Sequence, residues 1–194
     1  MGDLYNRLDE LQAVTRVLSK DVQFYREQCN RTEPQEIDSL ASANHRAYVR
    51  AVFALIEALI EQHKGLLLDL HDSGVVAVDP KLVDRLREQE RFMRLKDKVK
   101  TVYKAAGIAF GQKLKMDCAS AGWRALAAAI KTRDRVTHPK CFQECSVQVW
   151  DLDLVQQGEA WFRAMHNEFV RVAREHRTAI GWKPGAPIPT SAAD

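Results

Sequence analysis

The chain of 194 residues lacks most of the features that assign a protein to a functional class at first sight. It has only four cysteines, and their spacing is not that of a disulfide framework, so we interpret them as reduced thiols of a cytoplasmic protein. No apolar run approaches the roughly 20 residues that a membrane-spanning helix needs, and charges among the first ten residues argue against a secretory signal peptide. A glycine-rich phosphate loop is missing as well. We therefore expect no membrane contact and no nucleotide cofactor of the P-loop type.

A strong excess of charge is also missing, because the net charge is only +3. The charge is unevenly distributed, however: residues 81–115 hold 11 Lys and Arg against four acids, a local charge of +7. A positive segment of this size can attract a polyanion, although solvated helix faces often have the same composition. Within it, Lys96, Lys100 and Lys104 are candidate contacts to RNA phosphates.

Hydrophobic periodicity predicts helices along nearly the whole chain, and it is clearest at the N-terminus. Eight residues there alternate steps of four and three over about four heptads, and only one is polar: Leu4, Leu8, Leu11, Thr15, Leu18, Val22, Tyr25 and Cys29. A helix with such a stripe needs a long partner surface. Either another helix of the same chain or a second subunit could provide it.

Further helices follow from apolar stripes and capping residues. A second helix is expected over about 35–70, and its stripe consists of large apolar residues: Tyr48, Val52, Phe53, Leu55, Ile56, Leu59, Ile60, Leu66, Leu67 and Leu70. Asp79 and Pro80 are a typical N-cap and first residue, and predict a short third helix. A basic fourth helix should carry the apolar residues between Phe92 and Phe110.

The C-terminal half is expected to contain two more helices. Ser120 should cap one that ends near residue 138, residues 139–149 should form a loop, and Asp151 should cap a long last helix.

Together these elements predict an all-α fold, an up-and-down bundle of five or six helices. We expect a single domain over residues 1–180, made of the N-terminal heptad helix (1–30) and a core bundle (35–176). Residues 181–194 are rich in proline and small residues, which is typical of a flexible tail.

Residues 133–140, Arg-Asp-Arg-Val-Thr-His-Pro-Lys, are the strongest functional candidate. Asp134 and His138 are spaced i,i+4 on one helix face, and an aspartate beside a histidine suits a general acid or base near neutral pH. Because a residue before proline avoids the helical conformation, His138 should stand at the helix end with an exposed ring. Arg133 and Arg135 carry planar donors that match phosphate oxygens.

The same residues also fit an ordinary helix C-terminus. Cationic side chains there complement the helix dipole by roughly 0.3–1 kcal/mol each, and Pro139 is a common stop signal. The spacing itself is not specific, since the chain contains a second pair, Arg171 and His176. That pair lies in a segment rich in Arg and Glu, which we interpret as a surface.

Other groups of residues that could form a functional site are less specific than residues 133–140. His138, Cys141 and Cys145 suggest zinc, but a structural site normally shows a tighter cysteine pair and a clear fourth ligand, so we expect no metal and no cofactor. His63 and His71 stand eight residues apart without nearby carboxylates, and are expected at the surface or at a helix end.

The tryptophans at three positions are expected to pack in the core or between subunits rather than to stack on bases: Trp123, Trp150 and Trp161. They carry no functional prediction of their own. The candidate site therefore depends on residues 133–140 alone.

In the sequence, Arg133, Asp134 and His138 resemble the R-x(4–6)-H signature of the HEPN superfamily. Its members are small all-helical domains, and a polar residue often follows the arginine of the signature. Residues 137–140, Thr-His-Pro-Lys, resemble the continuation common in bacterial members. Residues 46–57, which end in a glutamate, resemble the early core helix of the family, with less specificity. The resemblance spans about residues 35–176.

The resemblance implies a homodimer in which two motifs face each other, and a metal-independent endoribonuclease of a toxin–antitoxin or phage-defence system. His138 would move protons at the ribose 2′-oxygen or the leaving 5′-oxygen, Arg133 would stabilise the phosphate charge, and Asp134 would hold the histidine. Arg135 and Lys140 would bind phosphates. The implied partners are RNA, a second copy of the chain and an antitoxin or defence protein.

Two points qualify this implication. Members that a nucleotidyltransferase silences carry a tyrosine two residues after the histidine, where this chain has Lys140. That mode of control is therefore in doubt. Some members are non-catalytic binding modules, so a helical dimerisation or interaction module is the alternative.

Overall fold

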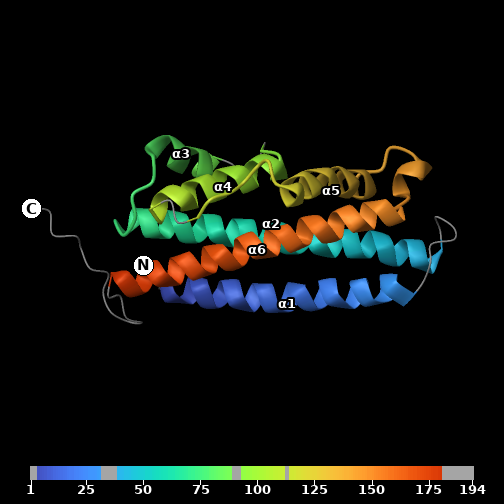
Figure 1. Cartoon of the computed structure of the whole chain (residues 1–194), viewed down its shortest axis with the longest axis horizontal. Helices are drawn as coiled ribbons and strands as arrows, with labels where there is room; N and C mark the ends of the chain where they lie inside the picture. The colour runs from blue at the N-terminus through green and yellow to red at the C-terminus, as the bar shows by residue number, and fades with distance from the viewer. Residues whose placement is uncertain (1–3, 32–38, 89–92, 112–113, 181–194) are drawn as a thin grey trace, which may run out of the picture. The chain divides into compact units, whose positions relative to one another are not determined.

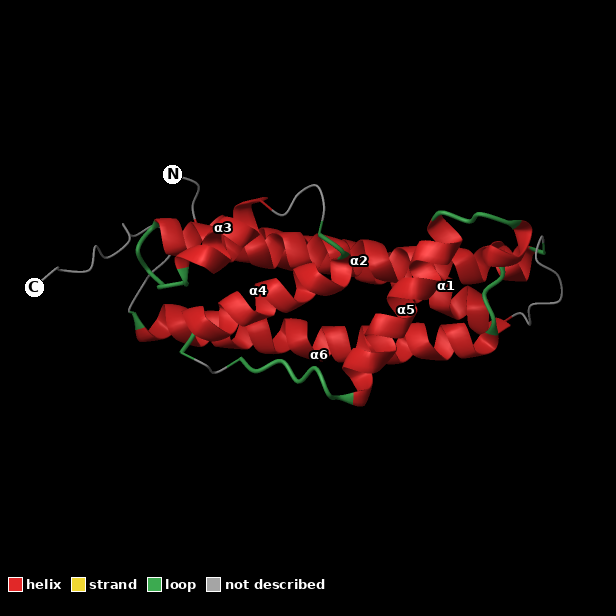
Figure 2. Ribbon diagram, turned by 90° about the horizontal axis from the view of Figure 1, so that it is seen from above, coloured by secondary structure: helices red, strands yellow, loops and turns green. Residues whose placement is uncertain are grey.

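The computed structural model describes residues 4–31, 39–88, 93–111 and 114–180. These residues form six α-helices and one short 3₁₀ helix (Figure 1): α1 Leu4–Arg31, α2 Leu40–Asp72, α3 Pro80–Glu88, α4 Leu95–Ala109, α5 Ala121–Thr137, η1 Phe142–Cys145 and α6 Val149–Ala179. No strand occurs in the described part of the chain (Figure 2), so the predicted all-α fold is confirmed. None of the described helices is both long and apolar enough to cross a membrane. The predicted tail, 181–194, lies outside the described residues.

The starts of α3 and α5 follow the capping rules, and the start of α6 corrects one prediction. Lys81 N donates to Asp79 Oδ1 (2.9 Å), and Trp123 N donates to Ser120 Oγ (3.3 Å), as the sequence predicts. Asp151, expected to be the N-cap of the last helix, lies instead in the first turn of α6. Its Oδ2 accepts from Gln148 N (3.0 Å), which is how an acid at the third helical position satisfies the backbone of the cap.

The chain divides into two compact units. Unit 1 comprises residues 1–13, 59–116 and 164–194, and unit 2 comprises residues 14–58 and 117–163. Helices α1, α2 and α6 contribute to both units, α3 and α4 belong to unit 1, and α5 and η1 belong to unit 2. The expectation of a single domain stays a prediction.

A histidine pair lies in the core of unit 1. His63 of α2 is fully buried, and its Nε2 is 3.0 Å from Nδ1 of His166 on α6. The ring of Phe169 stacks on His63 with centroids 3.9 Å apart. Our expectation that His63 lies at the surface or at a helix end was wrong. It is four residues from both Leu59 and Leu67, so it shares their buried helix face.

Burial also determines the charge of His63. Removal from water, and then the neighbouring His166, lower the pKa of His63 well below its usual value, so the ring is neutral near pH 7. No described residue provides a hydrogen-bond partner for His63 Nδ1. The other histidine considered with it, His71, lies in the last turn of α2 as expected.

In unit 2, a cluster of polar and charged side chains joins α1, α2 and α6. Glu159 of α6, 1% exposed, accepts hydrogen bonds from Arg26 of α1 (2.5 Å), Tyr48 of α2 (3.0 Å) and Arg163 of α6 (2.7 Å). Burial raises the pKa of Tyr48, which keeps its hydroxyl a donor. The ion pair with Arg26 shows that α1 packs against the same chain in this unit, which answers part of the question left open by the heptad pattern.

Helices α5 and α6 approach each other closely in unit 2. A Cβ atom built on Gly158 of α6 would lie 2.8 Å from the Cα of Leu126 on α5. No real side chain tolerates that separation from a neighbouring backbone, so the contact requires glycine. The contact fixes α5, and with it the helix end that carries residues 133–140.

Candidate active site

His138 forms the C-cap of α5. Its backbone N–H donates to Asp134 O (3.0 Å), and its side chain is exposed, as Pro139 predicts. No hydrogen bond to the imidazole comes from the described residues. The side chain of Asp134 accepts from Arg133 Nη1 (2.9 Å) rather than from His138. In one copy of the chain, the ring is thus available to an external group, and Asp134 does not orient it.

Arg133 is largely buried and is held between two carboxylates. Its Nη2 pairs with Oε1 of Glu57 on α2, and its Nη1 pairs with the exposed Asp134. A guanidinium carries five N–H donors in a rigid plane, so two anchored nitrogens fix the direction of the others. A phosphate that reached Arg133 would compete with the exposed Asp134 more easily than with Glu57.

The two segments that carry the family resemblance lie side by side. Arg50 Nη2 donates to Val136 O (2.9 Å), and Arg46 Nη1 donates to Cys145 O (3.5 Å). With the Glu57–Arg133 pair, three contacts join residues 46–57 to the end of α5 and to the loop that follows it.

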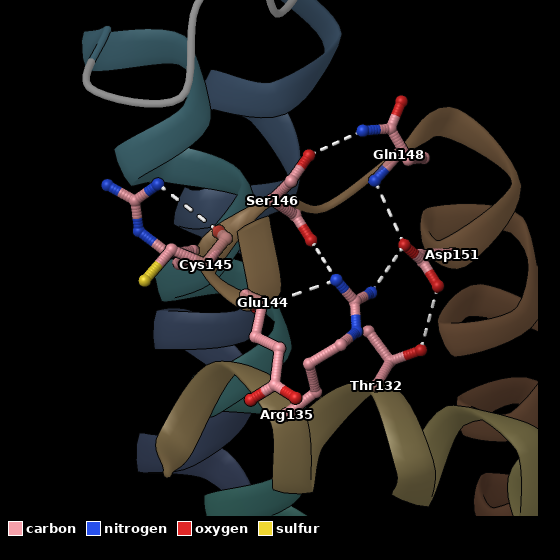
Figure 3. Close-up of polar contacts among 8 residues, drawn as sticks. Thr132, Arg135, Glu144, Cys145, Ser146, Gln148 and Asp151 are labelled. Atoms are coloured by element: carbon pink, nitrogen blue, oxygen red, sulfur yellow. Dashed lines mark hydrogen bonds and ion pairs between the residues drawn. The ribbon is translucent and has the colours of Figure 1, made fainter. Parts of the chain in front are cut away.

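Arg135 is occupied within the protein, as Figure 3 shows. Its Nη1 donates to the carbonyl oxygens of Glu144 and Ser146, and its Nη2 lies 2.7 Å from Oδ2 of Asp151. The other carboxylate oxygen of Asp151 accepts from Thr132 Oγ1 (2.9 Å). This cluster fixes the path between α5 and α6. The predicted phosphate contact of Arg135 would have to replace one of these bonds.

The lysines expected to bind phosphate fall into different parts of the chain. Lys140 is exposed beside the motif, and its backbone N–H donates to Glu144 Oε2 (2.6 Å). By contrast, Lys96, Lys100 and Lys104 lie on α4 in unit 1, whereas residues 133–140 lie in unit 2. The site that unit 2 builds by itself therefore contains Arg133, Asp134, His138 and Lys140 without the α4 lysines.

The nearby cysteines are free thiols. Cys141 is exposed and Cys145 is half-buried, one at each end of η1. Within the described ranges, no group of three or more His, Cys, Asp or Glu side chains is arranged to hold a metal ion.

Sequence reasoning missed the way in which α2 supports the motif. Arg46, Arg50 and Glu57 are spaced four and seven residues apart, so they share one helix face. A charged stripe opposite the large apolar stripe of α2 was the signal that could have found them. Trp150 does not pack in the core, because the residue is 64% exposed, and its expected packing between subunits stays a prediction.

Comparisons with protein-family models, with curated protein sequences and with solved structures find no match to this chain. A function must therefore be argued from the residues of the site.

Proposed function

We propose that the protein is a metal-independent endoribonuclease of the HEPN type, which cleaves RNA by attack of a ribose 2′-OH at a composite site in a homodimer. A role in a toxin–antitoxin or phage-defence system is part of this proposal. The observation that carries it is the end of α5: an exposed imidazole, His138, one turn beyond an arginine that Glu57 holds in place.

The chemistry needs one proton acceptor, one proton donor and a positive charge at the phosphate. His138 takes the proton of the 2′-OH as its oxygen attacks phosphorus, and the bond to the 5′-oxygen breaks as that oxygen receives a proton. The products are a 2′,3′-cyclic phosphate and a 5′-hydroxyl. Arg133 stabilises the charge that develops on the phosphate oxygens. One imidazole cannot be base and acid in the same step, and the His138 of a second copy supplies the other function.

The test is incubation of the purified protein with RNA, with and without EDTA, beside His138→Ala and Arg133→Ala. We expect cleavage to survive EDTA and to fall by about 10²–10⁴-fold when the proton-transfer group is removed. Arg171→Ala is the matched control, because Arg171 and His176 have the same spacing but Arg171 pairs with Glu168 and Glu175 on an exposed surface. Cleavage that persists in His138→Ala, or that EDTA abolishes, contradicts the mechanism.

The second candidate is a non-catalytic helical interaction module. It is favoured by the engagement of both arginines inside one copy, Arg133 with Glu57 and Arg135 with Asp151. It predicts a stable oligomer and no cleavage. Expression of wild-type protein and His138→Ala in cells separates the two: toxicity that depends on His138 supports the nuclease, and equal growth effects support the module.

A further inference from the structure

Two aromatic side chains are exposed in the chain segment that follows His138. Phe142 is 63% exposed at the start of η1, and Trp150 is 64% exposed in the first turn of α6. Burial of such rings is favourable, so two exposed rings in the segment next to the candidate site offer apolar area that a ligand could cover.

The backbone that carries these rings is held in place. Arg135 binds the carbonyl oxygens of Glu144 and Ser146, which flank Cys145 at the end of η1. It also binds Asp151, the residue after Trp150. Both aromatic residues therefore belong to a segment tied to the last turn of α5, where His138 is the C-cap. Rings on a fixed backbone lose little conformational entropy when a flat partner stacks on them.

Between the last turns of α5 and the first turn of α6 the basic residues outnumber the acids, and the exposed Asp153 follows on α6. Residues 131–150 contain four basic residues and two acids, and both acids already have partners: Asp134 pairs with Arg133, and Glu144 accepts from the backbone of Lys140. Lys131 and Lys140 are exposed, and their ammonium groups make no ion pair within the described residues. In the proposed homodimer two copies of this positive surface face each other across the composite site, and an RNA strand bound between them would neutralise their charge.

We propose that Phe142 and Trp150 form a stacking platform for unpaired bases of single-stranded RNA, next to the phosphate that His138 and Lys140 would contact. Aromatic stacking on unpaired bases combined with cations along the backbone is the usual way in which proteins hold single-stranded RNA. That the ligand is RNA rests on the proposed function. The stacking platform narrows the substrate to RNA with unstacked bases at the cleavage site.

The test measures binding rather than cleavage, with a fluorescent, unstructured RNA of about 15 nucleotides and the same RNA annealed to its complement. All variants are made in His138→Ala protein, so that the RNA stays intact. We expect Phe142→Ala and Trp150→Ala each to weaken binding of the single strand by about 5- to 150-fold, the effect of one lost stacked base. Trp150→Phe should recover most of the affinity, and the duplex should be affected little.

Val149→Ala is the matched control, because Val149 is 59% exposed in the same turn and has no ring. The platform is overturned if Val149→Ala weakens binding as much as Trp150→Ala, if neither aromatic variant changes binding, or if the single strand is not bound. It is also overturned if the aromatic variants shift a dimer to monomer in sedimentation velocity, since the rings would then contact a second copy.

Failure of the platform can be told apart from failure of the nuclease. Protein that cleaves RNA while its aromatic variants bind normally retains the nuclease and loses the platform. Protein that binds the single strand through Phe142 and Trp150 without cleaving it retains the platform and loses the nuclease.

Discussion

The core of unit 1 contains a histidine pair, His63 and His166, and the ring of His63 stacks on Phe169. The core of unit 2 contains a carboxylate, Glu159, which accepts from two arginines and a tyrosine. Both clusters join α2 to α6, but the buried His63 is neutral near pH 7, whereas Glu159 is held by oppositely charged partners. The difference implies that low pH should destabilise unit 1 through its buried histidine. Unit 2 should be destabilised most by removal of the Glu159 carboxylate.

The largest effect should come from Glu159→Ala. It leaves Arg26 and Arg163 without their shared acceptor and removes the acceptor of the Tyr48 hydroxyl. Removing one partner of a buried ion pair costs about 3–5 kcal/mol, but the two arginines are partly exposed and water screens them, so we expect about 2–4 kcal/mol. Urea unfolding followed by circular dichroism measures it.

The matched control for Glu159 is Glu61→Ala in unit 1. Glu61 also binds two cations, Lys64 and Lys98, but it is far more exposed. Because the Lys64 side chain is only 11% exposed, the loss of Glu61 should cost about 1–2 kcal/mol, still less than Glu159→Ala. Equal costs for the two glutamates would show that burial does not distinguish the two units.

Glycine substitutions should give the next largest effect, and the two units should respond differently. Gly158→Ala forces a methyl group against the backbone of Leu126, which should destabilise unit 2 by about 1–3 kcal/mol. Gly65→Ala places its methyl group 3.4 Å from the flexible end of Arg7, and should be neutral or stabilise by up to about 1 kcal/mol through helix propensity. Thermal unfolding of the two variants separates them. A stable Gly158→Ala protein would contradict the close packing of α5 and α6.

The smallest expected effect is the acid sensitivity of unit 1. Because burial lowers the pKa of His63 in the folded protein, the unfolded chain takes up a proton first as the pH falls below about 6.5. Stability is therefore complete above that pH and is lost below it, by about 1.4 kcal/mol at pH 5.5 for this one group. His63→Gln, which does not titrate, should lack this part of the pH dependence.

Hydrogen exchange measured by mass spectrometry locates the acid effect. Amides of α4, which belongs to unit 1, should exchange faster at pH 5.5 than at pH 7.5 after correction for intrinsic rates, and in His63→Gln this difference should shrink. His45 of unit 2 also has a pKa lowered by burial, so amides of α5 serve as the comparison. A larger acid effect in α5 than in α4 would reverse the assignment.

Local signals predicted the helices well because caps and stripes act over a few residues. Ser120 and Asp79 cap as expected, and the stripe of α2 is almost entirely buried. His138 stands exposed at the end of α5 because Pro139 follows it, which is another local effect.

Tertiary contacts decided what the sequence could not predict. Arg133 and Arg135 look equivalent in the sequence, but one meets Glu57 of α2, 76 residues away, and the other meets Asp151 of α6, 16 residues away. His63 was misjudged because its polarity was given more weight than its position between Leu59 and Leu67. Spacing along a helix gives the face of a residue, but the partner that covers this face depends on the packing of distant helices.

The bonds from Arg135 to the loop have a consequence for how this surface can change. Arg135 holds the carbonyl oxygens of residues 144 and 146, and every amino acid has such an oxygen. The path of the loop is therefore encoded in part by α5. Side chains such as Phe142 can be exchanged during evolution, and a new ligand preference acquired, while the backbone that presents them stays where it is.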